Sequence, residues 1–497
     1  MDGAVAIILI SVAFSLFLWL QSRRPENFPP GPWKFPVIGS RYFFPVWMSV
    51  RDMSTELAKT FGDVSGLYAG LGFPCIFVSG LEAIKEGLSR EDLSGRPENK
   101  YYKHKYGTTL GIAFSSGDSW RMQRRFTLHH LRNLGFGKRS LEGIAHEELQ
   151  AVFDTIDQRS GGCNEGYPVD IWDATAGATG SILWQIVAGK KIDPTNPEMK
   201  KIIMASDDLV ASNSRMMSGF LSRLTKTFPR LAAHFNLKSK GKPMAKFLRE
   251  AIASHKGNFD FDNPRDFMEV YLCEIQKQGE GLTDKFNERQ LLHVCADLFG
   301  AESGTTLRAL SFALLYMILY PEVQKRVQEE LDEVVGKDRL PSLSDRTRLP
   351  YTEATINEVL RISCVTPTTL PHSPLTDEEY VKFRGYHIPK GAAVVFNIYG
   401  LHHDPNLWES PEEFKPERFL PENENGIVPG SFIPFGAGKR KCLGETLARN
   451  NIFIFFAGIL QRYSLRVVDE LHKPSTKGYG MNSLRPAPFK VKFQSRC

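Results

Sequence analysis

The chain of 497 residues has 42% hydrophobic and 24% charged residues, which is typical of a globular protein with a large core. Its net charge of +6 is spread along the sequence, which argues against nucleic-acid binding. The seven cysteines are widely and irregularly spaced without a CxxC pair, so they predict free thiols in a reducing compartment rather than a zinc site.

Residues 4–20 form an uncharged apolar run that is just long enough to cross a thin bilayer as a helix. Asp2 precedes the run and Arg23 and Arg24 follow it, which favours a lumenal N-terminus and a cytosolic remainder. The alternative is a cleaved signal peptide, but such a peptide has its basic residues before the apolar core and small residues after it. We therefore expect residues 1–24 to be a retained membrane anchor.

Prolines dominate the next segment, residues 25–44, and prevent helix or sheet from continuing, so this segment is expected to be a stiff spacer. Residues 45–497 are expected to form one domain that is mainly α with small β-sheets. Helical spacing of apolar residues predicts helices near 45–60, 140–158, 168–188, 197–220, 243–256, 264–278, 287–319, 321–335 and 348–362. Strands are predicted at 64–68, 75–78, 386–388, 392–396 and 489–493.

The most informative stretch is residues 432–445, FIPFGAGKRKCLGE, where three glycines flank Cys442. Glycine allows backbone angles that are closed to other residues, so this loop can wrap around a flat ligand and direct N–H groups at the sulfur. A phosphate-binding loop is excluded, because that motif needs glycine at 433 and Ser or Thr at 440. A structural cysteine would not need adjacent glycines and cations, and no CxxCH motif for covalent haem attachment occurs.

The residues Phe435, Gly438, Arg440, Cys442 and Gly444 match the haem-binding signature of the cytochrome P450 family. The chain resembles the animal microsomal members of this family over nearly its whole length. The resemblance implies haem b with Cys442 as the axial thiolate and metal ligand, Arg440 paired with a haem propionate, and Phe435 packed beside the sulfur. In such sites the thiolate pushes electron density onto the iron and favours O–O cleavage.

Further residues join the site only through this resemblance. Trp120 and Arg124 are four apart on one helical face, and the family uses such a pair to bind a haem propionate. His372 resembles a second propionate contact, although a lone Trp or His is more often a packing residue. Glu358 and Arg361, together with the Pro416–Phe419 stretch, resemble the Glu-Arg-Arg triad that locks the core near the cysteine loop.

The stretch DLFGAESGTT, residues 297–306, resembles the oxygen-activating helix of the family but departs from its pattern. Aligned on Thr305, the chain has Glu302 where the family has glycine and Gly304 where it has an acid. Thr305 can still hold a hydroxyl over the iron and steer protons to dioxygen, and we hypothesise that Glu302 takes over proton delivery. The alternative is that Glu302 faces solvent or an ion pair and that waters perform the relay.

The resemblance implies a haem-thiolate monooxygenase that inserts one atom of O2 into a small lipophilic substrate, such as a steroid, a fatty acid or a xenobiotic. No GxGxxG fingerprint occurs, so electrons from NADPH are expected through a separate NADPH–cytochrome P450 reductase, with cytochrome b5 as a further candidate partner. The expected location is the endoplasmic reticulum membrane, with the catalytic domain in the cytosol. The basic residues expected to dock the reductase, unless they form a merely solvated face, are Lys439, Lys441, Arg121 and Arg125.

Two other functions stay open. One is a haem-thiolate isomerase or dehydratase that rearranges a peroxide without a reductase, and the retained Thr305 argues against it. The other is a non-catalytic haem-binding sensor, which needs only Cys442 and its loop. Residues 218–238 alternate apolar and basic side chains and predict either a second membrane contact or ordinary helix packing. The segments expected to line a substrate pocket are 100–116, 298–306, 365–370 and 478–481.

Overall fold

The structure is a computed structural model, and it describes most of the chain. The helix predicted at 197–220 lies almost wholly outside the described residues, and the apolar and basic patch predicted at 218–238 lies entirely outside them. The described residues are 2–36, 39–40, 43–45, 48–69, 72–98, 109–137, 141–160, 167–193, 199, 202–203, 242–257, 260–279, 285–423, 426–480 and 483–496.

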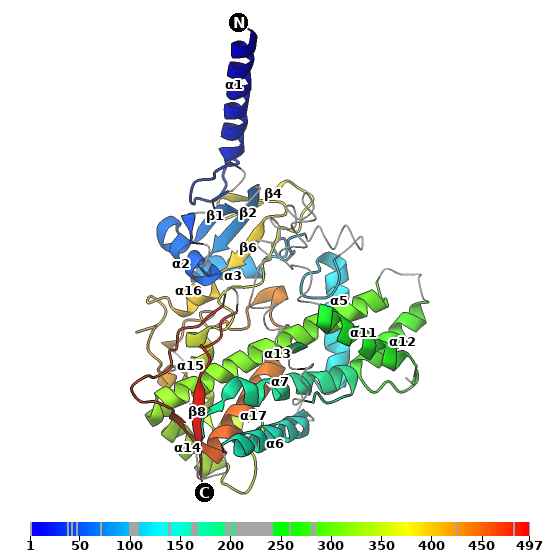
Figure 1. Ribbon diagram of the computed structural model, residues 1–497, viewed down its shortest axis with the longest axis vertical. Helices are drawn as coiled ribbons and strands as arrows, with labels where there is room; N and C mark the ends of the chain where they lie inside the picture. Colours follow the sequence, from blue (N-terminus) through cyan, green and yellow to red (C-terminus); the bar gives the residue numbers. More distant parts are fainter. Residues whose placement is uncertain are drawn as a thin grey trace.

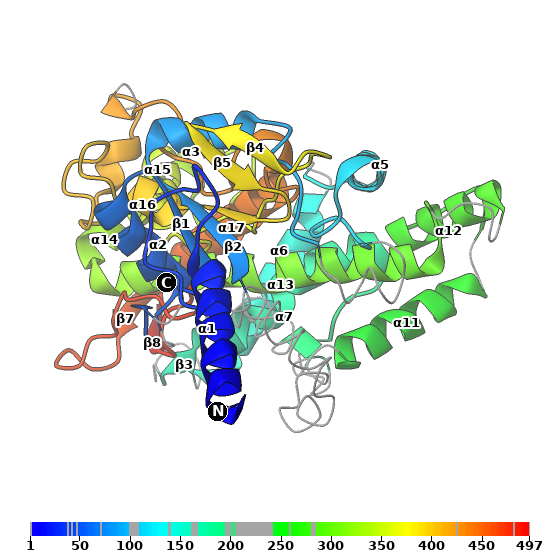
Figure 2. The ribbon, with the colours of Figure 1, turned by 90° about the horizontal axis from the view of Figure 1, so that it is seen from above.

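Helices form most of the body, and the longest of them, α13 (Glu288–Leu319), runs through its centre (Figure 1 and Figure 2). Two helices, α7 (Ile171–Ala188) and α17 (Glu445–Arg462), pack against α13, and α6 (Glu142–Arg159) packs against both of them. The other helices are α1 (Asp2–Ser22), α2 (Val50–Phe61), α3 (Leu81–Ser89), α5 (Gly117–Asn133), α11 (Lys242–Lys256), α12 (Phe267–Gln278), α14 (Pro321–Val334), α15 (Pro350–Ser363) and α16 (Ile398–His402).

Small sheets lie at the edges of this body. The first has the strand order β1 (Val64–Ala69), β2 (Phe73–Val78), β6 (Ala393–Phe396), with β1 and β2 antiparallel and β2 and β6 parallel. The second has the order β3 (Val169–Asp170), β8 (Lys490–Ser495), β7 (Tyr463–Val467), all antiparallel. A separate hairpin joins β4 (Tyr380–Phe383) to β5 (Tyr386–Pro389). The predicted fold class, mainly α with small sheets, is confirmed.

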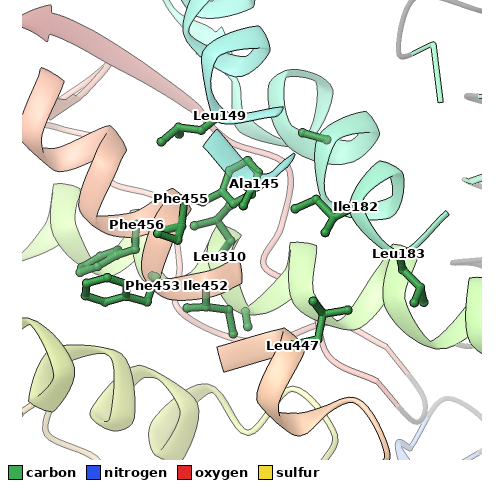
Figure 3. Packing of buried hydrophobic residues seen from close by; sticks show 14 of the residues in the cluster. Ala145, Leu149, Ile182, Leu183, Leu310, Leu447, Ile452, Phe453, Phe455 and Phe456 are labelled. Carbon is green, nitrogen blue, oxygen red and sulfur yellow. The ribbon is translucent and has the colours of Figure 1, made fainter. Parts of the chain in front are cut away.

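A large part of the core lies where α17 packs against α6 and α13 (Figure 3). Phe453 of α17 and Leu310 of α13 are fully buried there. Gly458 allows α17 to approach α6 closely, because a Cβ at this position would lie 2.4 Å from the Leu149 side chain. Burial of each large apolar side chain contributes roughly 1.5–3 kcal/mol. This packing fixes the helix that begins three residues after Cys442 against the central helix α13.

The N-terminal helix α1 projects from the body beside the β1-β2-β6 sheet (Figure 1). Its large apolar side chains, such as Ile10 and Phe14, are exposed. Among the described residues, no helix passes a length and hydropathy test for a membrane span on its own. The apolar part of α1 covers Ile8–Leu20, and the bent pair of α13 and α14 passes the test only together. The helix expected over residues 4–20 is present, and its insertion into a membrane stays a prediction.

The clearest difference between prediction and structure is α17, which the helical spacing did not reveal. Its central residues, Ile452 to Leu460, are all buried, because neighbouring elements cover the helix on every side. A helix of this kind has no polar face and therefore no 3.6-residue periodicity. The predicted helices at 287–319, 321–335 and 348–362 correspond within two residues to α13, α14 and α15.

Candidate active site

The loop that carries Cys442 is closed by its own backbone. The Cys442 N–H donates to the Phe435 carbonyl at 3.0 Å, and a single 3-10 turn, η7 (Gly438–Arg440), lies between them. Gly438 has a φ of +68°, and a Cβ on it would meet the Leu88 carbonyl oxygen at 1.9 Å. Only glycine satisfies both conditions, so this residue lets the loop turn tightly against the end of α3.

The Cys442 thiol is free and exposed, whereas the other free cysteines among the described residues are buried. Desolvation by the surrounding protein raises the pKa of this thiol. The backbone N–H of Gly444 lowers the pKa, as does the Arg124 guanidinium, whereas the charges of Glu302 and Glu445 raise it. A backbone donor aimed at the sulfur is what the glycine pattern predicted, and it stabilises the thiolate that binds iron.

Three arginines gather beside this loop, and none of them has a carboxylate partner within the part of the chain that the structure describes. Arg440 lies over the Trp120 ring, with 3.9 Å between the guanidinium carbon and the ring centroid. All three donate to main-chain oxygens: Arg440 to Ser94, Ile112 and Ser115, Arg96 to Ala113, Leu370 and Pro371, and Arg124 to Lys441.

The charges of this arginine cluster (Arg96, Arg124 and Arg440) predict that an anion binds between them. Burial and the charges of the other two arginines lower the pKa of Arg440 to about 8. Burial and the charge of Arg124 lower the pKa of Arg96 to about 9. Buried cations are stable when they are paired with anions. The two carboxylates of haem b match this requirement, and the exposed Cys442 sulfur matches its iron, so the donor set fits this cofactor.

The structure brings Trp120, Arg124 and Arg440 together as the resemblance implied, and it adds Arg96. Sequence inspection missed Arg96, because a single arginine before a proline in a loop belongs to no periodic pattern or motif. Burial keeps the pKa of His372 far below its usual value. The nearby positive charges of Arg96 and Arg440 lower this pKa further. Its Nδ1 is 3.1 Å from the Leu93 carbonyl oxygen, so the neutral ring is held by backbone.

We expect Arg440→Leu to release haem about 10- to 100-fold faster than the unchanged protein, since loss of one partner of a bound cofactor weakens binding by this order. The measurement is the rate of haem transfer to apomyoglobin, followed by absorbance. Arg121→Leu, on the exposed surface of α5 and outside the arginine cluster, is the matched control and should leave the rate unchanged. Equal rates for both variants would contradict the role of Arg440.

Between Leu298 and Ile318 of α13, Ala301 and Thr305 are the only described residues that are not buried. Ala301 is exposed and Thr305, one turn later, is partly exposed. The Thr305 hydroxyl donates to the Ala301 carbonyl at 2.8 Å, which leaves its oxygen free to accept a hydrogen bond. Because they are four residues apart, these two residues lie on the same face of α13, called here its accessible face.

Glu302 lies on a different side of α13 from this accessible face. Its side chain is buried, and its Oε1 accepts a hydrogen bond from Asn451 Nδ2 of α17 at 3.0 Å. Burial raises the pKa of Glu302 to about 7, against the opposing effects of Asn451 and Thr306. The carboxyl therefore faces neither bulk solvent nor a cation among the described residues, and it can exchange a proton near neutral pH.

The triad expected from Glu358, Arg361 and Arg418 is confirmed. Arg361 donates to both carboxylate oxygens of Glu358, at 2.7 and 2.8 Å, and Arg418 approaches the same carboxylate at 3.4 Å. Arg361 also donates to the His402 carbonyl at 2.7 Å, and His402 Nε2 accepts from the Ile433 N–H at 3.1 Å. Through His402 the triad is tied to the start of the cysteine loop, so its role is structural.

Most of the basic residues that were expected to dock the reductase form ion pairs within the protein. Glu91 pairs with both Arg121 and Lys439, and Lys441 pairs with Glu445 at 2.6 Å. Arg125 is exposed. Exposed pairs of this kind contribute little to stability, so these cations can exchange partners with an acidic protein.

Part of the expected substrate pocket lies outside the described residues, including 100–108 and Met481. Within the described part, Asp297 Oδ2 accepts from the backbone N–H groups of Ile112 and Ala113, at 2.7 and 2.9 Å. This contact holds the segment after residue 108 against α13, close to the accessible face that carries Ala301.

Comparison with known proteins agrees with this geometry. The family model described as Cytochrome P450 matches residues 29–493. Cytochrome P450 2J3 of Rattus norvegicus is 35% identical over 470 residues, covering 93% of this chain and 90% of the relative. Cytochrome P450 2J2 of Homo sapiens is 35% identical, with 93% and 90% covered. Farnesoate epoxidase of Bombyx mori is 34% identical over 501 residues, covering 99% of both chains.

Proposed function

The chain belongs to the cytochrome P450 family and is a monooxygenase, and we propose that it inserts one atom of O2 into a small lipophilic substrate using electrons that originate from NADPH. The observation that carries the proposal is the free, exposed Cys442 thiol, held by the Gly444 N–H beside the arginine cluster. Haem, when bound, supplies one-electron and O2 chemistry, and a thiolate ligand favours O–O cleavage.

Each residue of the site has a proposed role. Cys442 binds the iron, with Phe435 in the same backbone-closed loop packed beside the sulfur. The arginine cluster and Trp120 bind the propionates, and His372 supports them from its place beside Arg96 and Arg440. Thr305 presents a hydroxyl on the accessible face of α13, and Glu302 supplies the proton that this hydroxyl passes on.

The electron donor is proposed to be a separate NADPH–cytochrome P450 reductase, with cytochrome b5 as a second donor. The exposed cations Arg121, Arg125, Lys439 and Lys441 support a docking surface for an acidic flavoprotein. The exposed apolar helix α1 supports an anchor in the endoplasmic reticulum membrane, with the body on the cytosolic side. This placement brings the site close to substrates that are dissolved in the bilayer.

The substrate is proposed to be a small lipophilic molecule of the steroid, fatty-acid or xenobiotic type. A relative that aligns with 99% of this chain is named for epoxidation of farnesoate, and others are named only as P450 enzymes. Between Leu298 and Ile318 of α13, the described side chains that are not buried are those of Ala301 and Thr305, one apolar and one hydroxylated. Such a surface favours hydrocarbon with few polar groups.

The test is oxygen-coupled NADPH consumption by the haem-loaded protein with reductase present, screened over lipophilic compounds with product analysis. Substrate-stimulated consumption with an oxygenated product supports the proposal. Conversion of an organic peroxide without reductase would instead identify an isomerase or dehydratase. Bound haem with neither activity would identify a sensor and overturn the proposal.

We expect Thr305→Ala to lower product formation roughly 10²-fold while NADPH oxidation continues, because general acid catalysis contributes this much or more. The lost electrons should appear as hydrogen peroxide, which is the quantity to measure. Glu302→Gln should show the same divergence in weaker form, since its proton reaches the site through Thr305. If Glu302→Gln matches the unchanged protein in turnover and peroxide release while Thr305→Ala does not, Glu302 is not in the relay.

A further inference from the structure

Asn451 is a polar residue in an apolar setting. It is buried in α17 between Leu447 and Ile452, which both belong to the core shown in Figure 3. A buried amide without a hydrogen-bond partner costs about 1–3 kcal/mol, so such residues persist where they bind something. The hydrogen bond that Asn451 donates from its side chain goes to Glu302 Oε1 on α13.

We propose that Asn451 is a positioning residue for Glu302, whose amide holds the carboxyl on the α17 side of α13 and controls the proton that it carries. This inference rests on the proposed proton-delivery role of Glu302. The carboxylate form accepts the Asn451 hydrogen bond more strongly than the neutral form does, so the amide stabilises the charged state. Burial acts in the opposite direction, and the two effects together leave the pKa at about 7.

Asn451 also borders a hollow on the side of α17 that faces α6. It lines a small, partly open hollow between α6 and α17, together with Glu142 and Asn450. The Glu302 side chain is buried, whereas Asn451, which binds it, lines this hollow. The Asn451 side chain therefore lies between the hollow and the Glu302 carboxyl, which is three residues before Thr305 on α13.

Asn451 is the main hydrogen-bond partner of Glu302, and several charges on the surrounding elements are engaged elsewhere. The Cys442 thiol feels the Glu302 charge, and Thr306 lowers the Glu302 pKa after Asn451. Several ionisable groups on these elements have other partners: Glu445 with Lys441 and Arg449, Glu148 with Ser181 and Gln185, Glu142 with the Leu343 N–H, Asp173 with Arg159, Asp297 with the Ile112 and Ala113 N–H groups, Asp157 with Arg462, Glu358 with Arg361 and Arg418, Glu330 with Thr352, Arg346 with Glu353, His255 with Asp266, Arg496 with Asp332, and Arg308 with the Ser483 carbonyl.

The experiment compares Asn451→Leu with Asn450→Leu in the haem-loaded protein with reductase. Asn450 lines the same hollow but binds Arg346, so it is a matched control. The readout is peroxide released per NADPH consumed, as a function of pH. In the unchanged protein peroxide should rise with a midpoint near 7, as Glu302 loses its proton. Asn451→Leu should move this midpoint upward by about one to two pH units, and Asn450→Leu should not move it.

Two further variants separate a specific effect from a loss of folding. Asn451→Ser keeps a small donor and should give an intermediate shift at unchanged haem content. In a Glu302→Gln background, Asn451→Leu should add no shift, because the titrating group is gone. An Asn451→Leu midpoint equal to that of the unchanged protein, or the same shift in the Glu302→Gln background, would overturn the inference.

A second readout does not depend on turnover. The carboxylic C=O band that disappears in Glu302→Gln can be titrated by difference infrared spectroscopy in the oxidised protein. If reductase-driven oxygen consumption is absent but this band titrates higher in Asn451→Leu, the proposed function fails and the pairing stands. If reductase-driven oxygen consumption is present and the Glu302 band titrates at the same pH in Asn451→Leu as in the unchanged protein, only the Asn451 inference fails.

Discussion

Cys442→Ser is expected to abolish both the thiolate spectrum and the monooxygenase activity. A thiolate opposite carbon monoxide gives reduced haem a strongly red-shifted Soret band, which a serine or histidine ligand does not produce. The Cys442 sulfur is exposed and is stabilised by the Gly444 N–H and Arg124, and serine supplies no comparable anion. The measurement is the reduced carbon monoxide difference spectrum together with product formation, which should fall to background.

Cys364→Ser is the matched control for this experiment, because Cys364 is also a free cysteine but is buried with its pKa raised strongly by burial. The control variant should keep the red-shifted band. A folded Cys442→Ser protein that retains haem and the same red-shifted band would contradict the ligand assignment, and with it the proposed mechanism.

Glu358→Ala is expected to lower the free energy of unfolding by about 3–5 kcal/mol, which is the cost of leaving a buried charge without its partner. The side chains of Glu358 and Arg361 are both 0% exposed, so water cannot replace the lost carboxylate. The measurement is urea unfolding of the haem-loaded protein followed by circular dichroism. Haem retention should fall in parallel, because His402 links the triad to the cysteine loop.

An exposed ion pair on a neighbouring helix is the control. Glu329 of α14 lies 3.7 Å from Lys325, and both side chains are largely exposed. Glu329→Ala should cost less than about 1 kcal/mol, since solvent screens such pairs. Equal losses for Glu329→Ala and Glu358→Ala would show that the triad has no special structural role.

The fold class was predictable, and the proposed haem ligand could be assigned, because their signals are local. The cysteine loop encodes its own geometry, since Gly438 alone permits the approach to Leu88 and sits four residues before Cys442. Helices such as α13, α14 and α15 were predicted because their apolar side chains recur at helical spacing. The helix α17 was missed because its central residues, Ile452 to Leu460, are apolar and buried on every side, which removes the periodic signal.

The family, the largely helical architecture and the proposed cysteine ligand could therefore be read from contiguous residues, which carry their signals. The distant residues that meet became known from the folded chain. Arg96 joins Arg124 and Arg440 through contacts that span up to 344 positions, and Glu302 finds Asn451 across 149 positions. The order of residues along the chain does not encode such pairings, because they arise when helices pack and polar groups that lose water must find partners inside the core.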